Sequence, residues 1–294
     1  MTGGPSVAKD RWRELCKSVA DDDGLPTWKE ASSWTERKLY FWHRYIDITT
    51  QAMVGNPSWS GGLAYVDLFA GTGVCTLKGS GKRIPGSVLI AANALKPFRV
   101  MIACEKNPAH AEACQVRLGR TPVGNSCHVF VGDCNQKVQE IIHLIPRGAL
   151  TMVFIDPQGL DNNFETIAAL SKGGSVDFVA LFADAYDINR NWERVYRDDP
   201  NSKLDLVLGP DSGWREKLGR LDNPTGLNKR KLFAEIYKSQ LRRHLRYTEF
   251  GEQNIDDRGR PLYKLIYASR HPLGLKFWHE AIKKEPSGQR SLLD

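Results

Sequence analysis

The sequence predicts an α/β fold: a doubly wound, mostly parallel sheet of the Rossmann type, closed by an antiparallel hairpin near the C-terminus. Three observations favour this fold. From residue 64 onward short apolar runs alternate with helical stretches, and a glycine-rich turn follows the first run directly. Two β-like runs at 247–250 and 262–268 are then joined by a polar turn. Strands alternating with helices are typical of a parallel sheet covered on both faces.

The elements follow in a regular order. We expect a helix over 34–53, from its apolar side chains at helical spacing, before the glycine-rich break ahead of the first strand. The serine after Gly86, Ser87, predicts an N-cap for the next helix. Expected strands lie at 64–69, 99–104, 127–131, 151–155 and 176–182, and expected helices between them at 87–95, 108–118, 134–144 and 164–171.

The predicted organisation has three parts. They are an N-terminal helical extension over 1–60, a main domain over 61–284 and a tail over 285–294. A long basic segment at 187–245 interrupts the main domain, and we expect it to be helical and to pack over the site. A parallel α/β sheet closed by an antiparallel hairpin is the arrangement of class I methyltransferases, which use S-adenosylmethionine (SAM).

Composition fits an ordinary globular protein, with 41% hydrophobic and 26% charged residues among 294. No apolar run approaches the ~18 residues of a membrane span, and the N-terminus lacks the apolar core of a signal peptide, so a cytoplasmic location is expected. The six cysteines form neither a C-x-x-C pair nor a cluster with zinc spacing. They are interpreted as reduced thiols, and no metal site is predicted.

Four acidic residues end or follow successive apolar runs: Asp67, Glu105, Asp133 and Asp156. Parallel strands bring their carboxyl ends to one edge of a sheet, so we expect these side chains to project into one cleft. One such acid alone is more often a cap or turn residue. Four in register favour a ligand site.

The turn in "AYVDLFAGTGVC" points to a nucleotide-type ligand. Gly71 and Gly73 let the backbone approach a ligand closely. Glu105 can accept both hydroxyls of a ribose, Asp133 an adenine amino group, and Asp67 the ammonium of the amino-acid end of SAM. The predicted cofactor-binding residues are Asp67, Phe69, Gly71, Gly73, Glu105, Asp133 and Cys134.

Spacing disfavours the competing ligands. The dinucleotide fingerprint needs a third glycine, where this chain has Thr76, and an acid ~20 residues on, whereas Glu105 lies much further along. A phosphate-binding loop needs Gly-Lys followed by Ser or Thr, and Arg83 follows Lys82 here. SAM is therefore the predicted cofactor.

The motif "DPQG" at 156–159 carries the predicted chemistry. Methyltransferases acting on exocyclic amines use an Asp-Pro-Pro-aromatic turn at this place, so Asp156 and Pro157 are the predicted catalytic residues. Gln158 stands next in the turn, and Phe182 or Tyr186 would have to supply the stacking ring. The corresponding loop offers no cysteine nucleophile for cytosine-C5 chemistry.

A net charge of +7 permits an anionic partner. The stretch "LNKRKLFAEIYKSQLRRHLRY" predicts a helix with an apolar inner stripe and a basic outer face. If it borders the cleft, Arg242 and Arg243 would contact a nucleic-acid backbone. The alternative is a helix face that is only solvated.

In its order of motifs the chain resembles the three-Cys-motif partner proteins (TcmP), a prokaryotic family of methyltransferase-like proteins. The matching pieces are "WTERKLYFWHRYI", "YVDLFAGTG", "PGSVLIAA", "VFIDPQG" and "LYKLIYASRHPLGLKFWHEAI". Thr72 and Gln158 depart from the family pattern, which has a proline and an aromatic residue there. The resemblance implies a SAM-type fold and a separate partner that bears three cysteines and resembles radical-SAM enzymes.

The sequence therefore predicts a SAM-dependent methyltransferase acting on a nucleic acid or a nucleobase-like acceptor, at an amine or a hydroxyl. Transfer would proceed by in-line displacement, catalysed mainly by alignment. A non-catalytic SAM- or nucleotide-binding subunit is the first alternative, and a nucleotide hydrolase the second. No membrane partner is expected.

Overall fold

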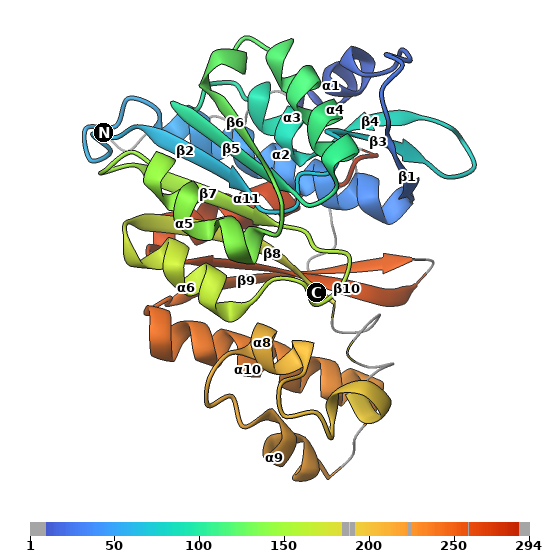
Figure 1. Ribbon diagram of the computed structural model, residues 1–294, viewed down its shortest axis with the longest axis vertical. Helices are drawn as coiled ribbons and strands as arrows, with labels where there is room; N and C mark the ends of the chain where they lie inside the picture. The colour runs from blue at the N-terminus through green and yellow to red at the C-terminus, as the bar shows by residue number, and fades with distance from the viewer. Residues whose placement is uncertain (1–9, 184–187, 189–191, 223–224, 258, 288–294) are drawn as a thin grey trace.

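The computed structural model describes residues 10–183, 188, 192–222, 225–257 and 259–287 (Figure 1). Its centre is a seven-stranded sheet with the order β6-β5-β2-β7-β8-β10-β9. All neighbours pair in parallel except β10, which is antiparallel to both β8 and β9. The strands are β2 (Leu63–Asp67), β5 (Val100–Glu105), β6 (Cys127–Val131), β7 (Leu150–Ile155), β8 (Ser175–Phe182), β9 (Glu249–Asp257) and β10 (Arg260–Ser269).

This strand order confirms the predicted fold. The chain moves outward from β2 to β5 and β6, returns to β7 on the other side of β2, and ends in the β9–β10 hairpin. That is the class I methyltransferase arrangement. The order reverses at β2, and ligands of open α/β sheets bind at such a reversal, outside the carboxyl ends of the strands.

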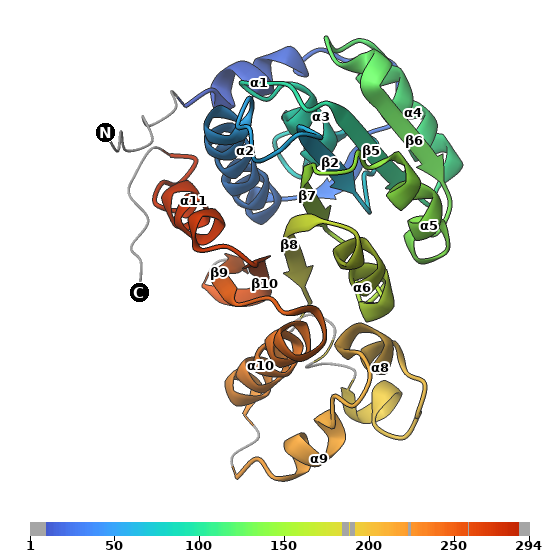
Figure 2. The same cartoon turned by 90° about the vertical axis from the view of Figure 1, so that its left-hand side faces the viewer.

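Helices cover both faces of the sheet. Helices α2, α3, α4 and α11 lie on one face, and α5, α6 and α10 lie on the other. Figure 2 shows α2 and α11 to the left of the sheet and α5 and α6 to its right. Their bounds are α2 Ser33–Met53, α3 Ser87–Ala92, α4 Pro108–Gly119, α11 Pro272–Ile282, α5 Cys134–Leu144, α6 Phe164–Lys172 and α10 Gly226–Leu245. Shorter helical elements are α1 Trp12–Ser18, η1 Gly124–Ser126, η3 Trp192–Tyr196, α8 Lys203–Leu208 and α9 Trp214–Gly219.

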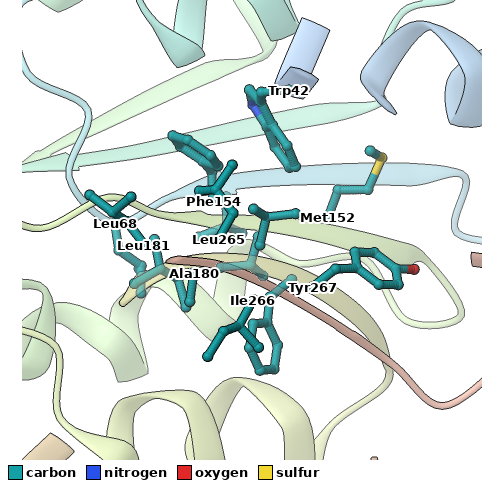
Figure 3. Close-up of a cluster of buried hydrophobic side chains, with 14 of the residues drawn as sticks. Trp42, Leu68, Met152, Phe154, Ala180, Leu181, Leu265, Ile266 and Tyr267 are labelled. Carbon is teal, nitrogen blue, oxygen red and sulfur yellow. The ribbon is translucent and has the colours of Figure 1, made fainter. Parts of the chain in front are cut away.

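The core lies on both sides of the central strands (Figure 3). Every residue of β2 and β7 is buried, which explains why these strands are apolar without alternation. On the α2 face, Trp42 stacks on Phe154 of β7 at 4.5 Å between ring centroids. This contact fixes α2 across the sheet, beside the carboxyl end of β7.

A small second sheet was not anticipated from the sequence. Its strands are β1 (Trp28–Ala31), β3 (Val74–Leu77) and β4 (Arg83–Pro85), in the order β1-β3-β4. The chain leaves the glycine turn into β3 and returns through β4, where Gly86 N–H donates to the Gly73 carbonyl at 2.7 Å. Gly79 and Gly81, both with positive φ, make the tight turn between the two strands. The glycine turn is thus separated from α3 by a hairpin.

The start of α3 differs from the expected cap. Gly86 is the N-cap residue and Ser87 the first helical residue, with no side-chain cap. The side chain of Ser87 lies beside Asp67 instead and acts to lower the pKa of that carboxyl group. Across the residues that the structure describes, no helix has the length and apolarity needed to cross a bilayer.

Candidate functional site

The glycine turn after β2 is built to leave space on its outer side. Gly71 and Gly73 have φ of +60° and +80°, a region that L side chains rarely adopt. A side chain at Gly71 would meet nothing within 4 Å, whereas one at Gly73 would touch Leu89 and Val88. Gly71 therefore faces open space and Gly73 faces the core.

Glu105 ties this turn to the neighbouring strand. One carboxylate oxygen accepts from Gly71 N–H at 2.9 Å and the other from Asn107 N–H at 2.8 Å. Each oxygen can accept a second hydrogen bond. The side chain is half-buried, so a hydroxyl-bearing ligand can reach it.

Asp67 does not project into a cleft, contrary to the expectation from sequence. Its side chain is fully buried and accepts from Tyr65 OH at 2.9 Å and from Phe69 N–H at 3.1 Å. Burial is the main reason why the pKa of Asp67 is raised to about 6, with the hydrogen bonds opposing the shift. Asp67 thus stabilises the glycine turn from the buried side, through its hydrogen bond with Phe69 N–H. The side chain of Phe69 is half-buried.

This carboxyl group gives stability a definite pH dependence. Because the folded pKa of Asp67 lies above its ordinary value of 3.8, the folded state binds its proton more tightly, and the contribution of this group to stability increases as the pH falls from 7 to 4. The shift corresponds to about 3 kcal/mol. In Asp67→Asn this contribution is absent. Urea unfolding should show that the difference in free energy of unfolding, wild type minus variant, is larger at pH 4.5 than at pH 7. An equal or smaller difference at pH 4.5 would refute this.

Asp133 lies at the far end of the acid row, as the N-cap of α5. Its Oδ1 accepts from the N–H and the side-chain amide of Asn135, both at 2.9 Å, while Oδ2 faces Lys106 at 3.7 Å. Asp133 is half-buried, so Oδ2 is available to an amino group. Cys134 is 3% exposed, and burial raises the pKa of its thiol. Cys134 packs in the core.

A buried arginine, missed in the sequence, clamps the turn to the N-terminal segment. Arg117 of α4 forms a two-pronged ion pair with Asp23, both contacts 2.8 Å. It also donates to the carbonyls of Pro26 at 2.8 Å and Thr72 at 2.7 Å. The hydrogen bonds from Arg117 are the largest cause that lowers the pKa of Asp23. Nothing in the sequence around Arg117 distinguishes it from a surface arginine.

At the end of β7, Asp156 is paired with a second residue that sequence reasoning missed. Lys38 Nζ of α2 lies 2.5 Å from Asp156 Oδ2, with the lysine side chain 4% and the aspartate 20% exposed. Pro157 is buried and Gln158 is exposed. Lys38 belongs to the helix expected over 34–53, and nothing in the sequence distinguishes it from its charged neighbours Glu36 and Arg37.

An aromatic pair flanks Lys38. Its Nζ lies 5.1 Å from the centroid of the Trp34 ring, in a cation–π contact. The Trp34 ring is tilted by 36° against Tyr263 of β10 at 5.0 Å. Trp34 is half-buried, so part of its surface is open beside the lysine–aspartate pair.

Phe182 does not supply the expected stacking ring. It is 3% exposed and stacks on Tyr237 of α10 at 5.2 Å. Both rings line a cavity of about 20 Å³ behind Pro157, where the buried Asn162 Oδ1 has no hydrogen-bond partner. That volume admits one water molecule. Tyr186, the other candidate, lies outside the described residues.

Arg242 and Arg243 lie at the wrong edge of the sheet for substrate binding, which corrects the prediction. The chain after α10 must return to the amino ends of the parallel strands to begin β9. Arg270, just after β10, donates to the carbonyls of Leu245 at the end of α10 and Gly174 ahead of β8. In Figure 1 the end of α10 accordingly lies on the left and the β9–β10 turn on the right.

A larger hollow of about 590 Å³ lies between α6, α8 and α9, and none of the predicted site residues lines it. Within the described ranges, no group of three or more His, Cys, Asp or Glu side chains is placed to hold a metal ion. The candidate site consists of the turn after β2 and the ends of β5, β6 and β7, where the residues described above lie.

Comparison with known proteins yields structural neighbours only. No family model and no curated protein matches the chain. An O-methyltransferase from Bacillus cereus in complex with SAH is 12% identical, with 90% of this chain and 92% of that chain covered and a TM-score of 0.46. A cofactor-bound protein from MTB is 16% identical, with 90% of this chain and 92% of that chain covered and a TM-score of 0.45. A protein from Legionella pneumophila is 13% identical, with 84% of this chain and 90% of that chain covered and a TM-score of 0.47. The fold of this chain is established by its own strand order.

Proposed function

We propose that the protein binds SAM at the carboxyl edge of the sheet and transfers its methyl group. The observation that carries this is the turn at Gly71, where a left-handed backbone opens onto free space and is fixed to Glu105. A ligand can approach this backbone more closely than any side chain would allow. The acceptor groups along the edge also suit SAM, because the carboxylates of Glu105 and Asp133 can accept from hydroxyl and amino groups.

Each residue of the site is assigned to one part of the cofactor. Glu105 takes the ribose hydroxyls, Asp133 Oδ2 the adenine amino group, and the Gly71 backbone the amino-acid end. Asp67 acts from behind by fixing the turn through Phe69 N–H. Bound SAM supplies an electrophilic methyl group on a sulfonium, and Asp156 at the end of β7 is the polar group assigned to the acceptor.

Glu105→Ala tests the cofactor site. Removing a charge-assisted hydrogen bond costs ~1.5–3 kcal/mol, so calorimetry should show SAM affinity weakened about ten- to a hundredfold. Glu112→Ala, which removes an exposed carboxylate from the adjacent helix α4, is the matched control and should change nothing. Absence of SAM binding by the wild type, or full binding by Glu105→Ala, would contradict the proposal.

Nucleic acid is the proposed acceptor class. A net charge of +7 favours a polyanion. Exposed lysines stand on elements around the glycine turn: Lys29 on β1, Lys106 after β5, which faces Asp133 at 3.7 Å, and Lys82 on the β3–β4 turn, which pairs with Glu36 at 2.6 Å. These lysines replace Arg242 and Arg243 as the proposed backbone contacts. If they neutralise phosphates, binding should weaken with salt, with a log–log slope of about 0.7–0.9 per contact.

Membership of the TcmP family is part of the proposal, supported by the ordered set of motifs. With it comes the proposed partner, a separate protein with three cysteines that resembles radical-SAM enzymes. The six cysteines of this chain are free thiols and do not bear on that partner's own cysteines.

A further inference from the structure

Lys38 is held beside Asp156 in an environment that fixes its position. Its side chain is 4% exposed, its ammonium lies 2.5 Å from the carboxylate, and the Trp34 ring stands 5.1 Å away. Burying an ammonium ion is costly unless it is paired. The pair bridges α2 and the end of β7, at the position assigned to the acceptor.

An amine acceptor fits this pair poorly. An amine nitrogen gains positive charge as it bonds to a methyl group, and an adjacent ammonium repels that charge in a site of low dielectric constant.

A hydroxyl acceptor fits well. Its oxygen gains negative charge as it loses its proton, and a preorganised ammonium stabilises that charge. The second oxygen of Asp156 carries no hydrogen bond from Lys38 and can take the proton.

We propose that Lys38 and Asp156 together select a hydroxyl oxygen as the acceptor, namely the ribose 2′-hydroxyl of RNA. This rests on the proposed SAM-dependent transfer to nucleic acid. Within a nucleic-acid chain the 2′-hydroxyl distinguishes RNA from DNA. The half-buried Trp34 ring offers a face on which a neighbouring unpaired base can stack.

The step balances without a further reactant. The hydroxyl proton passes to Asp156, the oxygen bonds to the methyl carbon, and the carbon–sulfur bond breaks with its electron pair going to sulfur. One positive charge on sulfur and one negative charge on Asp156 are both neutralised. Lys38 neither takes nor gives a proton in this step.

The first test uses Lys38→Met, Asp156→Asn and the double variant. Each single change should lower the transfer rate at saturation about 10²- to 10⁴-fold, the range for general acid–base groups. The double variant should lose no more than the worse single variant, because the pair acts as a unit. SAM and RNA affinities, by calorimetry and fluorescence anisotropy, should be unchanged. Lys172→Met, at the opposite edge, is the control.

Two results would overturn this assignment of the pair. One is a loss of affinity or thermal stability in Lys38→Met that accounts for its lost rate. The other is an additive double variant. Asp156→Asn removes the carboxylate but keeps a side-chain oxygen that can accept from the Lys38 ammonium, so it keeps the test decisive if Lys38→Met does not fold.

The second test locates the methyl group. Total RNA and genomic DNA from cells lacking the protein are incubated with labelled SAM, digested to nucleosides and separated by mass spectrometry. Label on ribose oxygens of RNA is expected. Label on base nitrogens, label on DNA, or no label despite SAM binding overturns the inference, whereas failure of the wild type to bind SAM overturns the proposed function itself.

Discussion

Gly71→Val should abolish SAM binding while leaving the fold intact. The valine side chain would occupy the open space that Gly71 faces, and it would disfavour the φ of +60° that aims the turn at Glu105. The steric effect acts on the ligand alone, because nothing in the protein lies within 4 Å of the added carbon, whereas the backbone strain lowers stability. Calorimetry on the purified variant measures the loss.

Gly55→Val separates ligand exclusion from backbone strain. Gly55 has a φ of +81° and also faces open space, but it follows α2 at the other edge of the sheet. Each variant should lose about 1–3 kcal/mol of stability from strain. Only Gly71→Val should lose binding. Retained SAM binding in Gly71→Val, or equal loss in both, would contradict the assignment.

Arg117→Met should cause a large loss of stability. It breaks a buried ion pair with Asp23 and strips hydrogen bonds from the carbonyls of Thr72 and Pro26. Breaking one side of a buried pair costs about 3–5 kcal/mol, and because Asp23 keeps Arg83 at 2.7 Å the loss should lie toward the lower end of that range. The total stability of a typical protein is about 5–15 kcal/mol. Urea unfolding at pH 7 measures this.

Arg120→Met is the matched control, because Arg120 directly follows α4 as its C-cap residue and faces the same carboxylate. Arg120 is 56% exposed and 3.4 Å from Asp23, so its pair should contribute less than about 1 kcal/mol. If the two variants lose similar stability, the contacts of Arg117 with Asp23 and with the Thr72 carbonyl do not stabilise the glycine turn.

The sequence predicts the sheet well because its signals are local. Alternating apolar runs and helices give the strands, and the acids after them mark one edge. The predicted strand at 127–131 and helix at 134–144 match β6 and α5 to the residue. The β3–β4 hairpin was missed because its strands are too short for periodicity to show.

What the sequence could not predict depends on tertiary contacts. Lys38 lies on the helix that Trp42 fastens to β7, and only that packing brings its ammonium to Asp156. The prediction that Arg242 contacts substrate was wrong because helical spacing shows which side of a helix is apolar but not which end of the helix lies near the site. Phe182 failed because Tyr237, distant in sequence, covers it.

Native mass spectrometry of the purified protein with SAM, NAD, and ATP with magnesium, each at equal concentration, tests the central claim directly. A single adduct with the mass of SAM or S-adenosylhomocysteine is predicted for the wild type, and none for Gly71→Val. An adduct with NAD or ATP in place of SAM, or no adduct with any of the three, would contradict it.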